Sequence, residues 1–172
     1  MRQLTVLLIA LLLGTTLVLT AADKPLNLKK LESMLIDSKG KKAKNVKLKD
    51  KKYILIYFSA HWCPPCRRFT PKLVEFYNKF NKGEFEVILV SADRTKKAQL
   101  EYMTSTSMPW PAVKLSKIRK SGLQSYAGQG IPCLVMIKPD GTIVSDTNVN
   151  GQYLGPQKVL SDLKKILSEK KN

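Results

Sequence analysis

Two cysteines separated by two prolines constrain the fold of this chain more than any other feature. The motif Trp62-Cys63-Pro64-Pro65-Cys66 follows a continuous apolar run, 53–58, and opens a stretch in which apolar residues recur at helical spacing. A buried strand that leads into Cys-x-x-Cys at the start of a helix is typical of a redox-active dithiol. The same spacing leaves two alternatives open, a structural disulfide and half of a metal site.

Strands and helices are predicted to alternate along the chain. The run 53–58 is too continuously apolar for a half-exposed strand, so we expect it at the centre of a sheet. After the dithiol come a helix to about residue 80, a second buried strand, 85–90, and a second helix. A hairpin turning at 139–141 and an amphipathic helix from Pro156 complete the order. This order predicts an α/β fold, with a central mixed β-sheet flanked by helices on both faces.

Weaker patterns predict the remaining segments. A short helix is expected over 27–35 and a lysine-bearing edge strand over 46–48, which together form an N-terminal extension of the sheet. Pro71 is expected to kink the helix that follows the dithiol. Residues 107–111, with two prolines, predict a rigid extended loop, and 116–126 predict a short helical stretch.

Residues 1–22 have the pattern of a signal peptide for export. Arg2 precedes a short apolar run, 4–13, and small residues at 20–22 close the segment. A retained membrane anchor is the alternative, but glycine and threonines interrupt the run, which is shorter than the roughly 20 apolar residues that a span needs. We therefore expect one mature domain, 23–172, in a bacterial periplasm or, alternatively, secreted.

The chain is strongly basic. Its formal charge is +17, and +16 without the expected signal, which contains one arginine and no acid. Lysines crowd 39–52 and 164–171, a pattern that fits either a solvated basic surface or attraction to an anionic partner. Aromatic residues do not interleave with these lysines as a single-strand nucleic-acid platform requires. We therefore favour the solvated surface and expect no nucleic-acid partner.

The full motif resembles one branch of a known superfamily. The chain resembles the tryparedoxin and nucleoredoxin branch of the thioredoxin superfamily over about 28–168. The segments that carry the likeness are 57–73, Val90-Ser91-Ala92-Asp93 followed by Met108-Pro109-Trp110, and Gly130-Ile131-Pro132. The resemblance implies a thioredoxin-like fold. It also implies a thiol–disulfide oxidoreductase that needs no cofactor beyond its redox-active disulfide.

The resemblance also implies roles for individual residues. Cys63 is implied as the attacking nucleophile, Cys66 as the residue that resolves the mixed disulfide, and Ile131-Pro132 as a cis peptide bond beside the two sulfurs. Two positions depart from common patterns. Tyr57 stands where many thioredoxins carry a buried aspartate, so proton handling must use water or another group. Cys133 stands where a threonine is more familiar.

The motif suits thiolate chemistry at a helix start. A helix N-terminus favours ionised Cys63, because its unpaired amides and its dipole both attract negative charge. Pro64 fits the first turn, where its missing N–H would have no intrahelical partner. Pro65 removes a second amide, which we expect to weaken thiolate stabilisation and stiffen the loop. Cys66, one turn on, is expected to be less exposed than Cys63.

Four neighbouring residues have open roles at this stage. Trp62 fits either a flat apolar wall that receives the substrate or ordinary packing. His61, the one histidine, fits a group that tunes the thiolate, but we favour an exposed bystander. Cys133 fits a third redox thiol, a soft metal ligand or an apolar filler. Trp110 is expected to pack its own loop.

The leading hypothesis is an oxidoreductase that reduces protein disulfides. Its expected partners are protein disulfide or dithiol substrates and an unidentified electron donor, for which a membrane thiol–disulfide carrier is a candidate, and we expect a monomer. The alternative is a protein that binds or delivers copper or zinc through Cys63, Cys66 and Cys133, with or without His61. A module with a purely structural disulfide is disfavoured, because closing so short a loop stabilises little. The odd cysteine count, three, also favours reactive use.

Overall fold

The computed structural model describes residues 26–169, so the expected export signal, 1–22, lies outside the described residues. Within this part of the chain no helix is both long and apolar enough to cross a bilayer. Residues 26–169 contain four α-helices and three 3-10 helices: α1 (Leu28–Glu32), α2 (Pro64–Phe80), α3 (Lys96–Ser105), α4 (Pro156–Glu169), η2 (Leu48–Asp50), η3 (Leu115–Lys120) and η4 (Leu123–Tyr126).

The described residues form a six-stranded mixed sheet and a small hairpin. The sheet has the order β1-β4-β3-β2-β5-β6, and β7 pairs with β8. The strands are β1 (Leu35–Ile36), β2 (Tyr53–Ser59), β3 (Phe85–Ser91), β4 (Ala112–Val113), β5 (Cys133–Ile137), β6 (Ile143–Asp146), β7 (Asn148–Val149) and β8 (Gln152–Tyr153). Strand β2 runs parallel to β3 and antiparallel to β5, so it is central, as its apolar run predicts.

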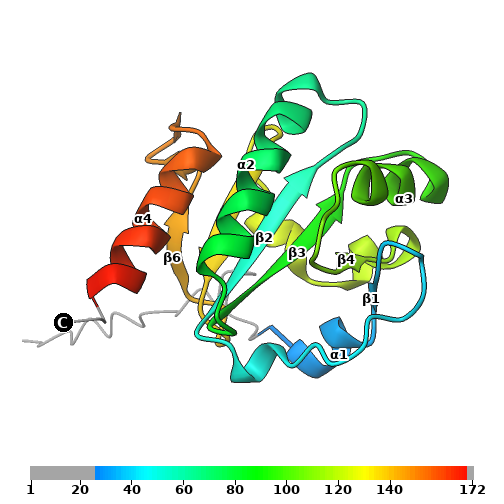
Figure 1. Ribbon diagram of the computed structural model, residues 1–172, viewed down its shortest axis with the longest axis horizontal. Coiled ribbons are helices and arrows are strands. Elements are labelled where there is room, and N and C mark those ends of the chain that lie inside the picture. Colours follow the sequence, from blue (N-terminus) through cyan, green and yellow to red (C-terminus); the bar gives the residue numbers. More distant parts are fainter. Residues whose placement is uncertain (1–25, 170–172) are drawn as a thin grey trace, which may run out of the picture.

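Helices cover both faces of this sheet, which confirms the predicted α/β fold. Figure 1 shows α2 and α4 side by side on one face, where they enclose the larger hydrophobic cluster together with residues of α3. A second cluster lies on the other face, under α1 and the 3-10 helices. Side chains alternate along β2, so the strand contributes to both hydrophobic clusters. Leu55 and Tyr57 lie in the cluster under α2, while Ile54, Ile56 and Phe58 lie in the cluster under α1.

The predicted edge strand over 46–48 is wrong. Leu48 instead begins η2; it is fully buried, and its N–H donates to the Glu32 carboxylate over 2.7 Å. The helix predicted over 27–35 ends at Glu32. The Ser33 hydroxyl caps it by donating to the Lys30 carbonyl over 2.6 Å, and Leu35 and Ile36 form edge strand β1. The long-range bond between Leu48 and Glu32 thus outweighs the local alternation of apolar residues and lysines that predicted a strand.

Other segments differ in detail from expectation. The stretch 116–126 forms two separate 3-10 helices rather than one helical piece. The loop 107–111 leads directly into β4, which the sequence did not predict, and the Pro111 carbonyl accepts the Leu89 N–H of β3 over 3.0 Å. Helix α2 continues through Pro71 to Phe80 without interruption.

Candidate functional site

The two motif cysteines form a disulfide at the start of α2, directly after the turn that follows β2. Their Cα atoms are 5.2 Å apart, and in this oxidised state both residues are buried. Cys63 is the N-cap residue of α2, and Cys66 lies in its first turn. The strand, turn and helix therefore hold the dithiol where the sequence predicts it.

The prolines determine which amide faces the Cys63 sulfur. Pro64 and Pro65 occupy the first two helical positions and have no N–H, so the first available amide is that of Cys66. This N–H donates to Cys63 Sγ over 3.2 Å. Pro65 thus removes one amide, as expected, but the remaining one is aimed at the sulfur, where it would stabilise a thiolate in the reduced protein.

The opposite side of the disulfide is formed by the Ile131-Pro132 loop. This peptide bond is cis, as the resemblance implies. The Ile131 carbonyl oxygen lies 3.8 Å from Cys63 Sγ, and the Ile131 side chain packs on the small cluster formed by both cysteines and Ala60. The sulfurs therefore lie between a helix N-terminus and the chain segment that enters β5.

Trp62 projects from the protein beside the disulfide. Its side chain is 61% exposed, the highest exposure among the large hydrophobic residues of 26–169, so ordinary core packing is excluded. Its indole N–H donates to the Ala92 carbonyl over 3.2 Å, which fixes the ring edge and leaves the ring face open. Trp110, by contrast, is buried in the larger hydrophobic cluster and packs against Tyr77 of α2 at 5.5 Å between ring centroids, so it joins its loop to the core and does not pack that loop alone.

Asp93 anchors the turn that carries Trp62, a role that the sequence analysis did not assign. It is only 6% exposed, and its two oxygens accept the His61 N–H over 2.9 Å and the Ser91 hydroxyl over 2.7 Å. The sequence signal that could have found it is an acidic residue two positions after the buried strand β3, which ends at Ser91. His61 itself is half-buried rather than exposed, and its ring stacks on Tyr102.

Buried hydroxyl groups lie beneath the first turn of α2, on the side where many thioredoxins carry an aspartate. The Tyr57 hydroxyl bonds to Thr70 Oγ1 over 2.9 Å and donates weakly to the Cys66 carbonyl. Thr70 donates to the same carbonyl over 2.9 Å and also contacts the Tyr102 hydroxyl, which reaches Ser59. Burial raises the pKa of Tyr57 far above its usual range, so this phenol stays neutral and holds α2 in position.

Cys133 is free, fully buried and separate from the disulfide. It pairs with Phe58 across β2 and β5 and belongs to the cluster on the α1 face, whereas Cys63 and Cys66 form their own cluster. Burial raises the pKa of its thiol, which opposes a reactive thiolate. No three His, Cys, Asp or Glu side chains of residues 26–169 are arranged to hold a metal ion. The structure therefore favours the filler role of Cys133 over a shared metal site.

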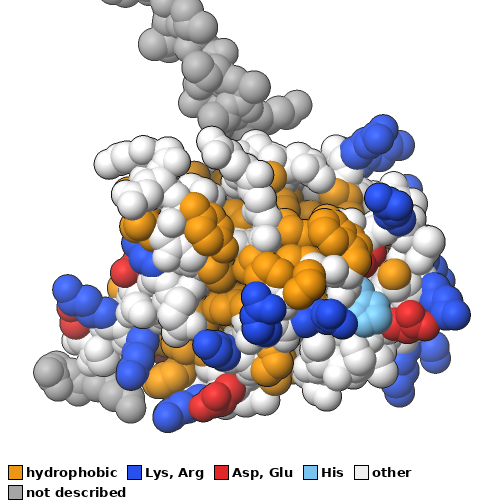
Figure 2. Space-filling model, turned by 90° about the horizontal axis from the view of Figure 1, so that it is seen from above, with side chains coloured by type: hydrophobic (Ala, Val, Ile, Leu, Met, Phe, Trp, Pro, Cys, Tyr) orange, Lys and Arg blue, Asp and Glu red, His pale blue; other side chains and the backbone are white. Residues whose placement is uncertain are grey.

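A groove of about 640 Å³ adjoins the dithiol on the Trp62 side. We call it the Trp62 groove; it is lined by His61, Trp62, Arg67, Asp93, Arg94, Thr95 and Ala98. Figure 2 views the molecule from the end at which α2 begins and shows hydrophobic side chains gathered there, with the histidine and several Lys or Arg side chains at the border. This end thus combines the dithiol, an apolar surface and cationic groups.

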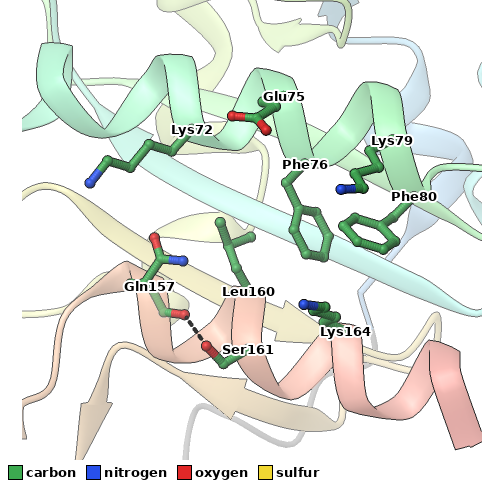
Figure 3. Close-up of a pocket in the computed structure, with 9 residues that line it drawn as sticks. All are labelled: Lys72, Glu75, Phe76, Lys79, Phe80, Gln157, Leu160, Ser161 and Lys164. Carbon is green, nitrogen blue, oxygen red and sulfur yellow. Dashed lines mark hydrogen bonds between the residues drawn. The ribbon is translucent and has the colours of Figure 1, made fainter.

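A second groove of about 440 Å³ lies between α2 and α4. Figure 3 shows its apolar floor and its lysines, which come from both helices. Its lining residues are Lys72, Glu75, Phe76, Lys79, Phe80, Gln157, Leu160, Ser161 and Lys164. None of these side chains is a cysteine or a histidine, so none of them supplies a group for thiol exchange. The candidate site is therefore the dithiol with the Trp62 groove.

Comparison with known proteins agrees with this geometry. A family model described as thioredoxin-like matches residues 50–143, which include the dithiol and the cis proline. Probable nucleoredoxin 1 of Arabidopsis thaliana is 42% identical over 125 residues, 67% of this chain and 21% of that protein. Nucleoredoxin of Mus musculus is 44% identical over 97 residues, 54% of this chain and 22% of that protein. The chain thus spans about a fifth of the length of these curated relatives.

Solved structures share the fold over nearly their whole length. Tryparedoxin I from Leishmania major has a TM-score of 0.61 and 29% identity, with 82% of this chain and 92% of that chain covered. Thioredoxin from Wuchereria bancrofti has a TM-score of 0.59 and 36% identity, with 77% and 94% covered. The chain belongs to the thioredoxin-like family of oxidoreductases, in its tryparedoxin and nucleoredoxin branch.

Proposed function

We propose that this protein is a thiol–disulfide oxidoreductase that reduces disulfides in other proteins, with Cys63 as nucleophile and Cys66 as resolving residue. One observation carries the proposal: Cys63 caps α2, and its sulfur faces the first free amide of the helix. An amide and a helix dipole favour the thiolate, which is the attacking form. Cys66 is positioned to close the disulfide again, because its sulfur is already bonded to Cys63 in the oxidised state.

The reaction proceeds in two exchanges. The Cys63 thiolate attacks one sulfur of the substrate disulfide; a mixed disulfide forms, and the second substrate sulfur leaves as a thiolate that takes a proton from water. Cys66 then loses its proton to water and attacks Cys63 Sγ, which releases the first substrate sulfur as a thiol and restores the Cys63–Cys66 disulfide. The substrate gains two electrons and two protons, and an external dithiol must reduce the protein again.

The surroundings of the dithiol support a protein substrate. Trp62 offers an open aromatic face on one side of Cys63, and the Ile131-Pro132 loop borders the other. An extended peptide placed between them would bring its disulfide to Cys63. We extend the proposal to an exported monomer, in a periplasm or secreted, that receives electrons from a membrane thiol–disulfide carrier; residues 1–22 are the basis for the export.

Reduction of insulin by dithiothreitol tests the proposed activity. The mature protein should accelerate the reduction, and Cys63→Ser should abolish the acceleration. Cys133→Ala is the matched control, because it removes the third cysteine without touching the dithiol. When equal amounts of folded protein are compared, its turnover should stay within about twofold of that of the parent. Unchanged turnover in Cys63→Ser contradicts the proposal.

Metal binding remains the second function that the sequence suggests, but no contact among the described residues favours it. Cys133 lies in the α1-face cluster, so the three sulfurs do not converge. An anaerobic titration with copper or zinc tests this function on the reduced parent and on Cys133→Ala. If all three sulfurs bind one metal ion, the parent should bind it tightly and stoichiometrically, and the variant should lose this binding.

A further inference from the structure

The Trp62 groove lies beside Cys63, because Trp62 directly precedes the nucleophile in the chain and lines the groove. Arg67 follows Cys66, with its backbone N–H bonded to the Cys63 carbonyl over 3.0 Å. Arg94 enters the groove from the segment between β3 and α3. A segment that flanks a substrate cysteine therefore extends over side chains from two separate parts of the fold.

The groove presents positive charge that the protein does not neutralise. Arg67 and Arg94 are exposed, and neither forms an ion pair within 26–169. The one carboxylate that lines the groove, Asp93, is buried, and its oxygens are occupied by the His61 N–H and the Ser91 hydroxyl. Two guanidinium groups are thus open to an incoming ligand.

The chemistry of these groups selects one class of ligand. A guanidinium donates paired hydrogen bonds to a carboxylate, which gives both charge and geometric complementarity. The open face of the Trp62 indole, fixed by its bond to the Ala92 carbonyl, suits an apolar side chain of the same segment. An acidic peptide with an apolar residue near its cysteine matches both features.

We propose that the Trp62 groove binds acidic segments that flank the disulfide of a protein substrate, so the enzyme prefers substrates with Asp or Glu near the reacting cysteine. Arg67 and Arg94 are the specificity-determining residues. This inference rests on the proposed reductase activity, but it adds a charge preference that thiol chemistry alone does not supply.

Three disulfide-linked peptide dimers of equal length test the preference. They differ only in flanking residues, which are Glu, Gln or Lys, and the mature protein is first reduced. Single-turnover rates are measured at about 0.15 M salt, because charges farther away than about 8 Å are largely screened there. Under these conditions the Glu peptide should react about tenfold faster than the Lys peptide. That figure corresponds to somewhat under 1 kcal/mol from each of two exposed ion pairs.

Two variants with the same change in charge separate the groove from the general basic surface. Arg94→Glu should slow the Glu peptide about fivefold and speed the Lys peptide. Arg119→Glu is the control: Arg119 is exposed on η3, over the other face of the sheet, and does not line the groove. It should change both rates by less than about twofold. Equal rates for all three peptides, or equal effects of the two variants, overturn the inference.

A binding measurement separates this inference from the proposed function. Monomeric peptides with serine in place of cysteine are titrated into the oxidised protein and followed by the fluorescence of the exposed Trp62, with Trp110 buried. The Glu peptide should bind more tightly than the Lys peptide, and Arg94→Glu should reverse the order. Selective binding without reduction contradicts the reductase and supports the groove. Reduction at equal rates without selective binding supports the reductase and contradicts the groove.

Discussion

At the scale of single residues, the site depends on the different surroundings of three cysteines. Cys63 meets a helix amide, Cys66 lies behind it in the first turn, and Cys133 is enclosed in the core of the opposite face. Their chemistry therefore follows from position rather than from residue type. The difference in surroundings is the basis for proposing one reactive sulfur, one resolving sulfur and one inert thiol in the same small domain.

Trp62→Ala separates substrate contact from stability. Because the side chain is mostly exposed, its removal should change the free energy of unfolding by less than about 1 kcal/mol. Reduction of a protein disulfide should slow by about tenfold, since an aromatic contact beside the nucleophile is lost. Insulin turnover and urea unfolding measure the two effects. A large loss of stability with unchanged turnover would assign Trp62 a structural role instead.

At the scale of elements, β2 and α2 are joined beneath the dithiol by hydroxyl groups. Tyr57 of β2 bonds to Thr70 of α2, and Thr70 bonds to the Cys66 carbonyl one turn earlier. The strand thus holds the helix start that carries both sulfurs. A neutral phenol performs this task without a buried charge, which would cost several kcal/mol if left unpaired.

Tyr57→Phe should lower the free energy of unfolding by about 1 kcal/mol, the typical loss for a buried hydrogen bond. Insulin turnover should stay within about twofold, because the raised pKa of Tyr57 keeps its proton in place and the hydroxyl contacts no sulfur in the structure. Chemical denaturation and turnover check both values. A strong loss of turnover at unchanged stability would show that the phenol moves a proton.

Glu86 of β3 gives the fold a predicted pH dependence. Burial raises the pKa of this carboxyl, which accepts bonds from the Tyr77 hydroxyl and the Val87 N–H. Below about pH 4 it is protonated in both states. As pH rises, the unfolded chain ionises first, so the unfolded state binds fewer protons and stability falls until the folded pKa is passed. Glu86 therefore destabilises the folded protein at neutral pH.

Glu86→Gln should consequently be more stable than the parent at pH 7, with the advantage fading as pH falls to about 4. The glutamine keeps an acceptor for Tyr77. Thermal midpoints across this pH range check the prediction. Glu101→Gln is the control, since Glu101 is exposed and its ion pair among the described residues is with Lys97 one turn away. If the stability advantage of Glu86→Gln over the parent instead grew as the pH fell, the predicted direction of the pH dependence would be contradicted.

Elements with long patterns could be predicted from the sequence, and those without could not. The apolar run of β2 extends over several residues, and the helical spacing of α2 extends over several turns. The sequence therefore placed the dithiol correctly between this strand and this helix. Strands β1 and β4 contain two residues each, too few to show any period. The contacts of Asp93 with His61 and of Glu32 with Leu48 join residues 32 and 16 positions apart, and no local pattern contains them.

At the scale of the whole molecule, stability comes mainly from two hydrophobic clusters on either side of the sheet, and the disulfide adds little to it. The disulfide closes a loop across a sequence separation of three, and the chain-entropy estimate for so short a loop is about 2 kcal/mol at most. We therefore expect the protein to stay folded when the disulfide is reduced, as the proposed redox activity requires.

Reduction with excess dithiothreitol should leave the protein folded and lower its Tm by less than about 8 °C, given about 2–4 °C per kcal/mol for a chain of this size. Far-ultraviolet circular dichroism and a thermal scan of both states make the comparison, and Cys133→Ala should show the same difference between states. A reduced protein without a cooperative transition would mean that the bridge is structural.

Alkylation of the reduced, folded protein tests the central claim most directly. Iodoacetamide is applied over a range of pH, and mass spectrometry assigns the modified residue. Cys63 should be labelled first, with an apparent pKa below the usual value of about 8.5, while Cys66 and Cys133 react only after unfolding. Preferential labelling of Cys66, or protection of both motif cysteines until the protein unfolds, would contradict a reactive Cys63 at the start of α2.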